Sequence, residues 1–143
     1  MQIKIKRFDK SLPLPAYKTA GAAAFDLCSR IDIVAIPNQV TLIPLNVAIE
    51  IPNGYHSLLL SRSSTQKLGL TPANGIGLID NDYCGDNDEW LFPIINFTDK
   101  DVKIEKGTRL AQVLIQKTEI FEIVEVEKLQ NMNRGGIGTT GVK

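Results

Sequence analysis

Residues 74–85, with the sequence Asn-Gly-Ile-Gly-Leu-Ile-Asp-Asn-Asp-Tyr-Cys-Gly, gather two carboxylates, a tyrosine and amide side chains between glycines. Asp80 follows two apolar residues, so we expect its carboxylate to emerge from the end of a buried strand, where it could act as a general base. Tyr83 could pack its ring against a flat or puckered ligand. A β-hairpin whose turn collects Asn, Asp and Gly for conformational reasons alone would have a similar sequence. This segment by itself therefore leaves a catalytic and a structural interpretation open.

A second segment, Ser61-Arg62-Ser63-Ser64, offers groups that bind anions. Arg62 supplies a planar charged fork, and the hydroxyls of Ser63 and Ser64 add neutral donors. The backbone N–H groups at the start of a short helix would add further donors for an anion. The structural alternative is a helix N-cap beside an exposed arginine. We interpret this segment as a candidate phosphate cradle.

Two further polar side chains lie on apolar strands. Gln112 interrupts the run Ala-Gln-Val-Leu-Ile, where its amide needs a hydrogen-bond partner; a ligand or, more commonly, a neighbouring carbonyl would serve. Asp26 ends a run of small residues, 20–27, that allows close packing. Its carboxylate is either a structural hydrogen-bond acceptor or an orienter of metal-bound water, and both remain open.

Composition excludes several classes of function. The chain has 143 residues, enough for one domain, and its 16 basic and 16 acidic residues give no general electrostatic case for binding nucleic acid or an anionic membrane. No apolar run is long enough to cross a bilayer. Cys28 and Cys84 match no metal spacing, so we expect free thiols in a cytoplasmic protein. The single histidine, His56, excludes a multi-histidine metal site.

The elements that must position these residues are short strands. Apolar runs rich in Ile and Val alternate with turn signals, which is typical of a β-sandwich, jelly roll or barrel. Only residues 63–68 look helical. The expected strands cover residues 3–7, 25–28, 31–36, 40–44, 47–51, 55–60, 77–79, 90–96, 102–104, 109–116 and 121–125.

The strand pattern stops after Lys128, where the chain becomes polar and rich in glycine. We therefore divide it into a β-rich domain, residues 1–128, and a C-terminal arm, residues 129–143. The arm cannot bury enough apolar surface to fold alone. It is either a frayed terminus or a segment that becomes ordered over a ligand.

Taken together, five segments resemble the five ordered motifs of the trimeric dUTP diphosphatases (dUTPases). They cover residues 20–27, 62–64, 74–85, 107–112 and 135–141, and so nearly the whole chain. The resemblance implies an all-β, jelly-roll-like fold that closes as a homotrimer, with active sites at subunit interfaces and the C-terminal arm folding over them. It also implies Mg²⁺-dependent, in-line attack of water on the α-phosphorus of dUTP. The products would be dUMP and pyrophosphate, which keeps uracil out of DNA and supplies dUMP for thymidylate synthesis.

The resemblance also implies roles for individual residues. Asp80 would activate the attacking water. Asn74, with backbone groups of the same hairpin such as those of Gly77, would bind the uracil edge, and Tyr83 would pack under the deoxyribose. Asp26 would lie near the Mg²⁺ ion and contact it through water. The phosphates would be held by Arg62, Ser63, Ser64 and Gln112.

The chain departs from the family pattern in the arm and after the hairpin. Ile137 replaces the usual phenylalanine, so it could cover the uracil but not stack on it; Gly138 and Thr139 follow it in the fifth motif. Arg134 lies two residues later than the family's arginine but could still reach the γ-phosphate. Residues 86–90 are longer than the usual continuation and add three carboxylates near the site.

These carboxylates raise an alternative activity. The dCTP deaminases share this fold, and residues 62–70 resemble their Arg-Ser-Ser segment followed by Gly-Leu. Deamination, alone or combined with hydrolysis, would need a carboxylate near the base amino group, and Glu89 is the candidate. A trimeric module of the same fold that binds a nucleotide or a protein without catalysis is the other alternative, and the retained Asp80 argues against it.

Overall fold

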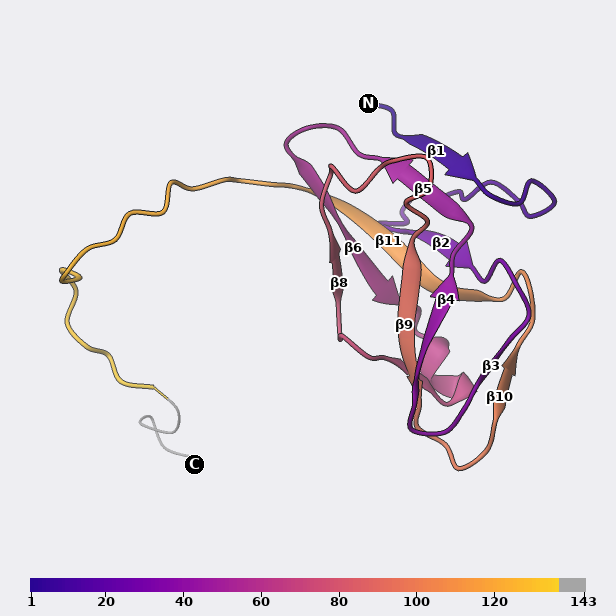
Figure 1. Cartoon of the computed structure of the whole chain (residues 1–143). Coiled ribbons are helices and arrows are strands. Elements are labelled where there is room, and N and C mark those ends of the chain that lie inside the picture. The colour runs from indigo at the N-terminus through magenta and orange to yellow at the C-terminus, as the bar shows by residue number, and fades with distance from the viewer. Residues whose placement is uncertain (137–143) are drawn as a thin grey trace.

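The computed structural model describes residues 1–136 and is almost entirely β-structure (Figure 1). Its single helical element is a 3₁₀ turn, η1 (Thr65–Leu68), within the described residues. The strands are β1 (Lys4–Arg7), β2 (Phe25–Cys28), β3 (Ile33–Ala35), β4 (Val40–Pro44), β5 (Val47–Glu50), β6 (Tyr55–Ser61), β7 (Leu70–Pro72), β8 (Gly77–Ile79), β9 (Leu91–Asn96), β10 (Val102–Ile104) and β11 (Arg109–Lys117).

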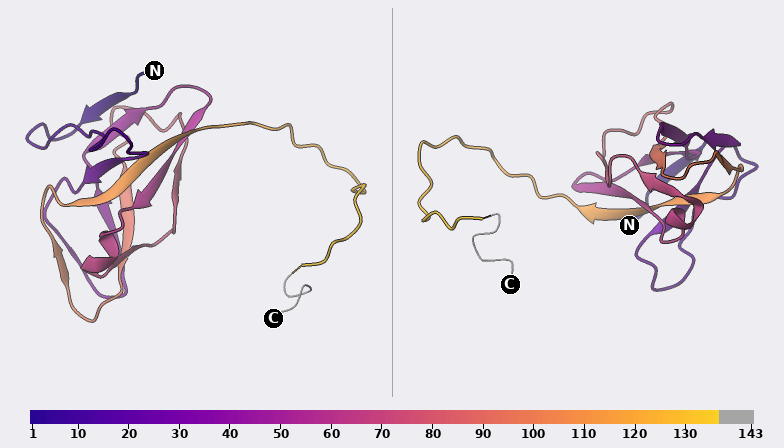
Figure 2. Two further views of the ribbon diagram at one scale, coloured as in Figure 1. Left: turned by 180° about the vertical axis from the view of Figure 1, so that it is seen from behind. Right: turned by 90° about the horizontal axis from the view of Figure 1, so that it is seen from below.

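The strands pair antiparallel in four small sheets. The largest has the order β2-β11-β6-β8, and a second has the order β4-β9-β7. The pairs β1-β5 and β10-β3 complete the body. In Figure 1, β4 and β9 lie in front of β6 and β11, and Figure 2 shows the same layers from behind and from below. This arrangement is the jelly-roll-like sandwich expected from the sequence.

The hydrophobic core lies between these layers. Both large sheets contribute fully buried side chains, among them Leu27, Leu59, Val113, Ile43, Phe92 and Ile94, and Trp90 is also fully buried. Burial alternates along β2, where Phe25 and Leu27 face the core and Asp26 lies on the other face. Because strand side chains alternate in this way, packing two neighbours inward fixes the direction of the Asp26 carboxylate.

Most of the expected strands are confirmed, with ends that differ by at most two residues. The three-residue strand Leu70–Pro72 was not predicted; it pairs with β9 and contains a proline, a residue that weakens any strand signal. The expected helix over residues 63–68 is shorter, a 3₁₀ turn closed by Gly69 in the left-handed conformation with φ 78°. The strand expected over residues 121–125 is wrong, because that segment pairs with no other part of the described chain.

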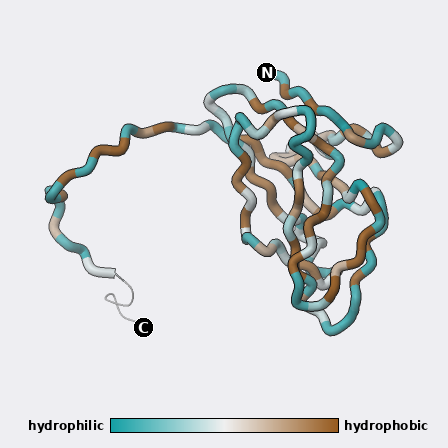
Figure 3. The backbone as a smooth tube through the Cα atoms, viewed as in Figure 1, coloured by the Kyte–Doolittle hydropathy of each residue, from teal (hydrophilic) through white to brown (hydrophobic). Residues whose placement is uncertain are grey.

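Beyond β11, residues 118–136 lead away from the body as an extended segment without helix or strand (Figures 1 and 2). The C-terminal arm, which begins at residue 129, continues this segment. Apolar and polar residues alternate along the first half of the segment (Figure 3). The exposed apolar side chains of the segment include Ile120, Phe121, Ile123, Val124 and Leu129. The segment therefore has the alternation typical of a strand, but residues 1–136 of a single chain contain no strand that pairs with it. Among the described residues, no helix is long and apolar enough to cross a membrane.

Candidate active site

The hairpin segment is held by strand β6. β8 pairs with β6 so that Ile79 lies opposite Ser57 and Gly77 lies opposite Leu59. Asp80 follows β8 directly and is exposed, so its predicted place at a strand end is confirmed. The expectation of a buried strand is wrong, because Leu78 in β8 is 64% exposed. The chain turns into β8 at Gly75, whose φ of 71° is readily adopted by glycine. The backbone of β6 thus fixes the position of the candidate base.

A pocket of about 400 Å³ opens beside this hairpin. The hairpin side contributes Asn74, Gly77, Asp80 and Tyr83. The other walls are mostly apolar, formed by Leu42, Leu59, Leu78, Ile79, Trp90, Leu91, Phe92 and Pro93. Apolar walls with a few polar groups at one edge suit a flat ring that has a polar rim. The structure therefore brings together four of the residues assigned to base, sugar and water.

Tyr83 forms two hydrogen bonds with backbone carbonyls, one before it and one after it in the chain. Its backbone N–H donates to the Asp80 carbonyl at 3.3 Å, and its hydroxyl donates to the Glu89 carbonyl at 3.4 Å. These contacts are local and modest, and the ring remains half-exposed at the pocket. The ring is therefore held at the edge of the pocket and is still accessible to a ligand.

A second group of polar residues surrounds Asp26. One carboxylate oxygen, Oδ1, accepts from Nε of Arg62 at 3.0 Å, and the other, Oδ2, accepts from Nη1 of Arg109 at 2.9 Å. Asp26 is largely buried, with 14% of its side chain exposed, whereas Arg109 is 48% exposed. Two guanidinium groups on one carboxylate leave one positive charge in excess. This cationic cluster, Asp26–Arg62–Arg109, is therefore suited to bind an anion.

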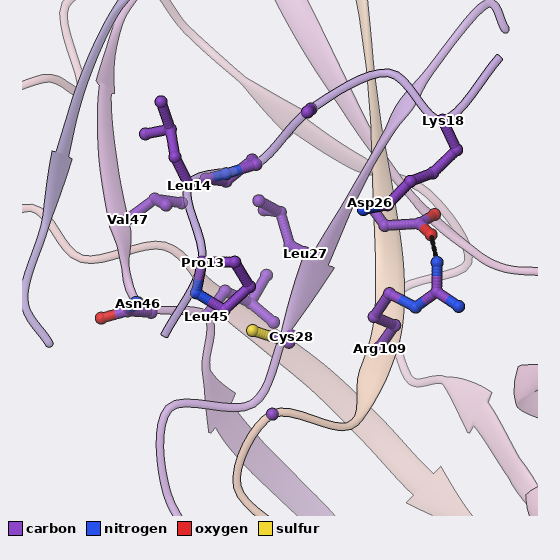
Figure 4. Close-up of a pocket in the computed structure, with 13 residues that line it drawn as sticks. Pro13, Leu14, Lys18, Asp26, Leu27, Cys28, Leu45, Asn46, Val47 and Arg109 are labelled. Carbon is purple, nitrogen blue, oxygen red and sulfur yellow. Dashed lines mark hydrogen bonds and ion pairs between the residues drawn. The ribbon is translucent and has the colours of Figure 1, made fainter. Parts of the chain in front are cut away.

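Two members of the cationic cluster, Asp26 and Arg109, line one end of another pocket, of about 250 Å³ (Figure 4). Lys18 points toward Asp26 from the loop before β2, and so adds positive charge at this end. Cys28, the strand partner of Arg109, also lines this pocket, and burial raises the pKa of its thiol. Both cysteines are free, as expected.

The remaining predicted phosphate ligands lie close to Arg62. Ser64 accepts from Nη1 of Arg62 at 3.2 Å, and Ser63 is exposed next to it. Gln112 lies directly opposite Asp26 in the β2–β11 pair. Its Nε2 donates to the Ser61 carbonyl at 2.9 Å, so in this structure its partner is a neighbouring carbonyl. Asp26 is likewise a hydrogen-bond acceptor here, which was one of its two open interpretations.

The three extra carboxylates do not line the base pocket. Asp86 pairs with Lys6 at 3.1 Å, and Asp88 accepts from the Gly85 backbone at 2.7 Å. Glu89 accepts from Nε and Nη2 of Arg30 at 2.7 and 2.9 Å. The segment that carries them borders the pocket, because Trp90 directly after Glu89 lines it, but the three carboxylates are engaged elsewhere.

Glu89 in particular is held away from a ligand. Its Oε1 also accepts from the Asn46 backbone N–H at 3.0 Å, and only 13% of its side chain is exposed. Because of this ion pair, the pKa of Arg30 is raised above its ordinary value. A carboxylate already engaged by three donors is poorly placed to act on a base amino group, so the deaminase alternative loses its candidate residue.

Arg109 is the residue that sequence reasoning missed. It belongs to the segment 107–112 that resembles the fourth motif, but only Gln112 was assigned a role there. The signal was an arginine three residues before a strand glutamine. Its contact with Asp26 depends on an irregular register between β2 and β11, which local patterns do not reveal.

The arm residues are not brought to the site within one chain. Arg134 is exposed on the arm, which leads away from the body (Figure 1). Ile137, Gly138 and Thr139 lie outside the described residues.

The single histidine forms a local contact: the Nδ1 atom of His56 lies 2.8 Å from the Thr118 hydroxyl. No group of three or more His, Cys, Asp or Glu side chains that could hold a metal ion occurs in residues 1–136.

Comparison with known proteins gives a consistent result. The family model described as dUTPase matches residues 10–141. The SPbeta prophage-derived deoxyuridine 5'-triphosphate nucleotidohydrolase of Bacillus subtilis is 39% identical over 145 residues, covering 100% of both chains.

Solved structures agree with this match. A dUTPase variant of Staphylococcus bacteriophage 80alpha, solved with dUpNHpp, superposes with a TM-score of 0.85 at 25% identity and covers 99% of each chain. A dUTPase variant from phage phi11 of S. aureus, whose structure describes a structural Mg(II) ion, shares the fold with a TM-score of 0.79 at 23% identity, over 92% of this chain and 100% of that one.

Proposed function

This chain belongs to the dUTPase family, and we propose that it hydrolyses dUTP to dUMP and pyrophosphate. The observation that carries the proposal is the pocket in which Asn74, Asp80 and Tyr83 meet apolar walls, on the same strand framework as a cationic cluster. A nucleoside triphosphate has a flat base with a polar rim at one end and a polyanion at the other. The two groups of residues match these two ends.

The base and sugar would bind at the hairpin. Asn74 and the backbone near Gly77 present donors and acceptors to the rim of the base, and such a pattern can reject cytosine because buried polar groups would then be left unpaired. Tyr83, at the pocket edge, would pack under the deoxyribose and crowd out a 2′-hydroxyl. Selectivity for base and sugar would thus come from a rigid segment.

The triphosphate would bind at the cationic cluster. Arg62, Ser63, Ser64 and Gln112 lie at or next to the end of β6 and on the neighbouring β11. Their donors would align the phosphates and offset charge that develops during attack. Asp80 would accept the proton of the water that attacks the α-phosphorus in line, and pyrophosphate would leave.

A Mg²⁺ ion fits this donor set only in part. The described residues hold no dense carboxylate cluster, so the ion would take most of its ligands from the triphosphate and water, as is usual for Mg²⁺. Asp26 would contribute through a bound water. When present, the ion would neutralise phosphate charge and favour a compact triphosphate conformation.

We propose that the active form is a homotrimer with active sites between subunits. None of Asp26, Arg62, Ser64 or Gln112 lines the hairpin pocket. Exposed apolar side chains on paired strands, such as Val34 and Val40, and along the arm also point to association. A neighbouring subunit would complete each site, and the arm with Arg134, Ile137, Gly138 and Thr139 would cover it.

The two free thiols, Cys28 and Cys84, fit an enzyme of the cytoplasm, where thiols are kept reduced.

The test is product release from dUTP, dCTP, dTTP and UTP, each with Mg²⁺ and with a chelator. We expect pyrophosphate from dUTP alone, lost when the metal is chelated. Ammonia from dCTP would instead indicate a deaminase. No product from any of the four would indicate a binding module without catalysis.

A further inference from the structure

Two arginine–carboxylate pairs in this protein differ in geometry. Arg30 closes a two-bond fork on Glu89 through Nε and Nη2, at 2.7 and 2.9 Å. Arg62 uses only Nε on Asp26, at 3.0 Å. A two-bond fork is a common arrangement for such pairs, so the open arrangement at Arg62 needs a cause.

The cause is Arg109. Its Nη1 takes the second oxygen of Asp26 at 2.9 Å, the oxygen that would otherwise turn to Nη2 of Arg62. Nη1 of Arg62 then donates to the Ser64 hydroxyl and, at 3.3 Å, to the Arg109 carbonyl. Within residues 1–136, Nη2 of Arg62 makes no hydrogen bond.

A β-bulge places Arg109 where it can do this. Gln112 pairs with Asp26 and Ala111 with Leu27, but the register then shifts and Arg109 pairs with Cys28. Without the shift, Arg109 would lie opposite the buried Ser29 and point to the other face of the sheet. The bulge therefore turns the guanidinium onto the face that carries Asp26.

The same bulge anchors the segment that carries Arg62. The Leu110 carbonyl, within the bulge, accepts from the Thr65 hydroxyl at 2.7 Å and from the Arg62 backbone at 3.3 Å. Thr65 is buried, and its hydroxyl also accepts from the Arg62 backbone at 3.2 Å. Backbone and guanidinium of Arg62 are thus positioned by one irregularity in β11.

We propose that Arg109 is a positioning residue for phosphate binding: it holds the second oxygen of Asp26, which keeps the fork open and leaves Nη2 of Arg62 to a phosphate oxygen. This inference rests on the proposed function, because it assigns Arg62 to the triphosphate. Loss of Arg109 would let Asp26 close on Arg62 and compete with the substrate. Asp26 would then act as an internal substitute for phosphate.

The test is a double-mutant cycle on the full chain, read as the dissociation constant of dUpNHpp and of inorganic tripolyphosphate. Arg109→Met should weaken binding of both about tenfold, as expected for one charge-assisted hydrogen bond. In the Asp26→Asn background, the same change should weaken binding less than about twofold, because an amide nitrogen cannot accept from Nη2. Deoxyuridine binding should not change.

Controls separate this role from general damage. Lys103→Met removes an exposed positive charge on β10 and should leave all three ligands unaffected. Arg109→Lys, which keeps one donor for Asp26, should recover part of the binding. Thermal unfolding checks each variant, and Arg109→Gln replaces Arg109→Met if the latter does not fold.

If Arg109→Met weakens phosphate binding equally in both backgrounds, Arg109 contacts the phosphate directly and the inference is overturned. Turnover of dUTP by the wild type would still support the proposed function. If Arg109→Met and Asp26→Asn are coupled in tripolyphosphate binding but the wild type does not hydrolyse dUTP, only the proposed function is overturned. A wild type that binds neither phosphate ligand would overturn both.

Discussion

Leu59 and Gly77 lie opposite each other in the β6–β8 pair, and a Cβ atom added at Gly77 would lie 3.1 Å from the Leu59 Cβ. The hairpin that carries Asp80 is thus packed more closely on β6 than a larger residue would allow. Since β6 leads directly into Arg62, this close approach also fixes the pocket relative to the cationic cluster.

Gly77→Ala should therefore reduce activity by displacing the hairpin. Such a contact is tighter than ordinary van der Waals packing and sits between strand backbones that cannot easily shift. We expect kcat/KM for dUTP to fall about tenfold, with a loss of stability of about 1–2 kcal/mol. Gly21→Ala is the matched control, because a Cβ there meets nothing within 4 Å. Equal activity of the two variants would contradict the proposed constraint.

Asp80→Asn should separate binding from chemistry. The side chain lies exposed at the end of β8 and makes no ion pair among the described residues, so its loss should leave the fold intact. We expect kcat to fall about 10²–10⁴-fold, the usual contribution of a general base. The dissociation constant of dUpNHpp, measured by calorimetry, should change less than about threefold. Much weaker binding would mean that Asp80 holds the ligand rather than the water.

Glu89→Gln should destabilise the protein without altering which nucleotide reacts. The change breaks the fork with Arg30 and leaves a partly buried guanidinium unpaired, so we expect a loss of about 1–3 kcal/mol in urea unfolding. Glu50→Gln removes the exposed pair with Lys4 and should have a smaller effect. Ammonia release from dCTP that disappears in Glu89→Gln would restore the deaminase alternative.

Removal of residues 131–143 should leave a folded protein with low activity. Every strand found in residues 1–136 lies before residue 118, so removing residues 131–136 takes no strand from the body. The arm would contribute Arg134 and a cover over the substrate, and we expect kcat/KM to fall about ten- to a hundredfold. Circular dichroism and light scattering would check that fold and oligomeric state persist. An unchanged rate would show that these residues do not reach the site.

Stability should depend on pH through Asp9. The Lys106 ammonium, 2.5 Å from the Asp9 carboxylate, holds the pKa of that carboxyl well below its usual range. A lowered folded-state pKa means that the pair stabilises the protein above the unfolded value, about 3.9, and that this stabilisation is lost as the pH falls below it. The difference in urea midpoint between wild type and Asp9→Asn should therefore be larger at pH 6 than at pH 3. Asp101→Asn, at an exposed position that forms no ion pair among the described residues, is the matched control.

Local patterns in the sequence were enough for the framework. Alternating apolar residues located β2, β4, β8 and β10 to the residue, because strand periodicity is a property of the segment itself. The same reasoning placed Asp80 at a strand end and Asp26 within the strand that covers residues 25–28. Residue types in five ordered segments were enough to indicate the family.

What the sequence could not determine depends on contacts between distant parts of the chain. Residues 121–125 have the alternation of a strand but no partner among residues 1–136. Glu89 was the candidate carboxylate of the deaminase alternative, but it is engaged by Arg30, 59 positions away. Arg109 joins Asp26 across 83 positions only because a bulge shifts the register. Pairing, register and charge neutralisation arise when strands pack. Spacing along the chain therefore determined which residues are available, and the tertiary structure decided which of them meet.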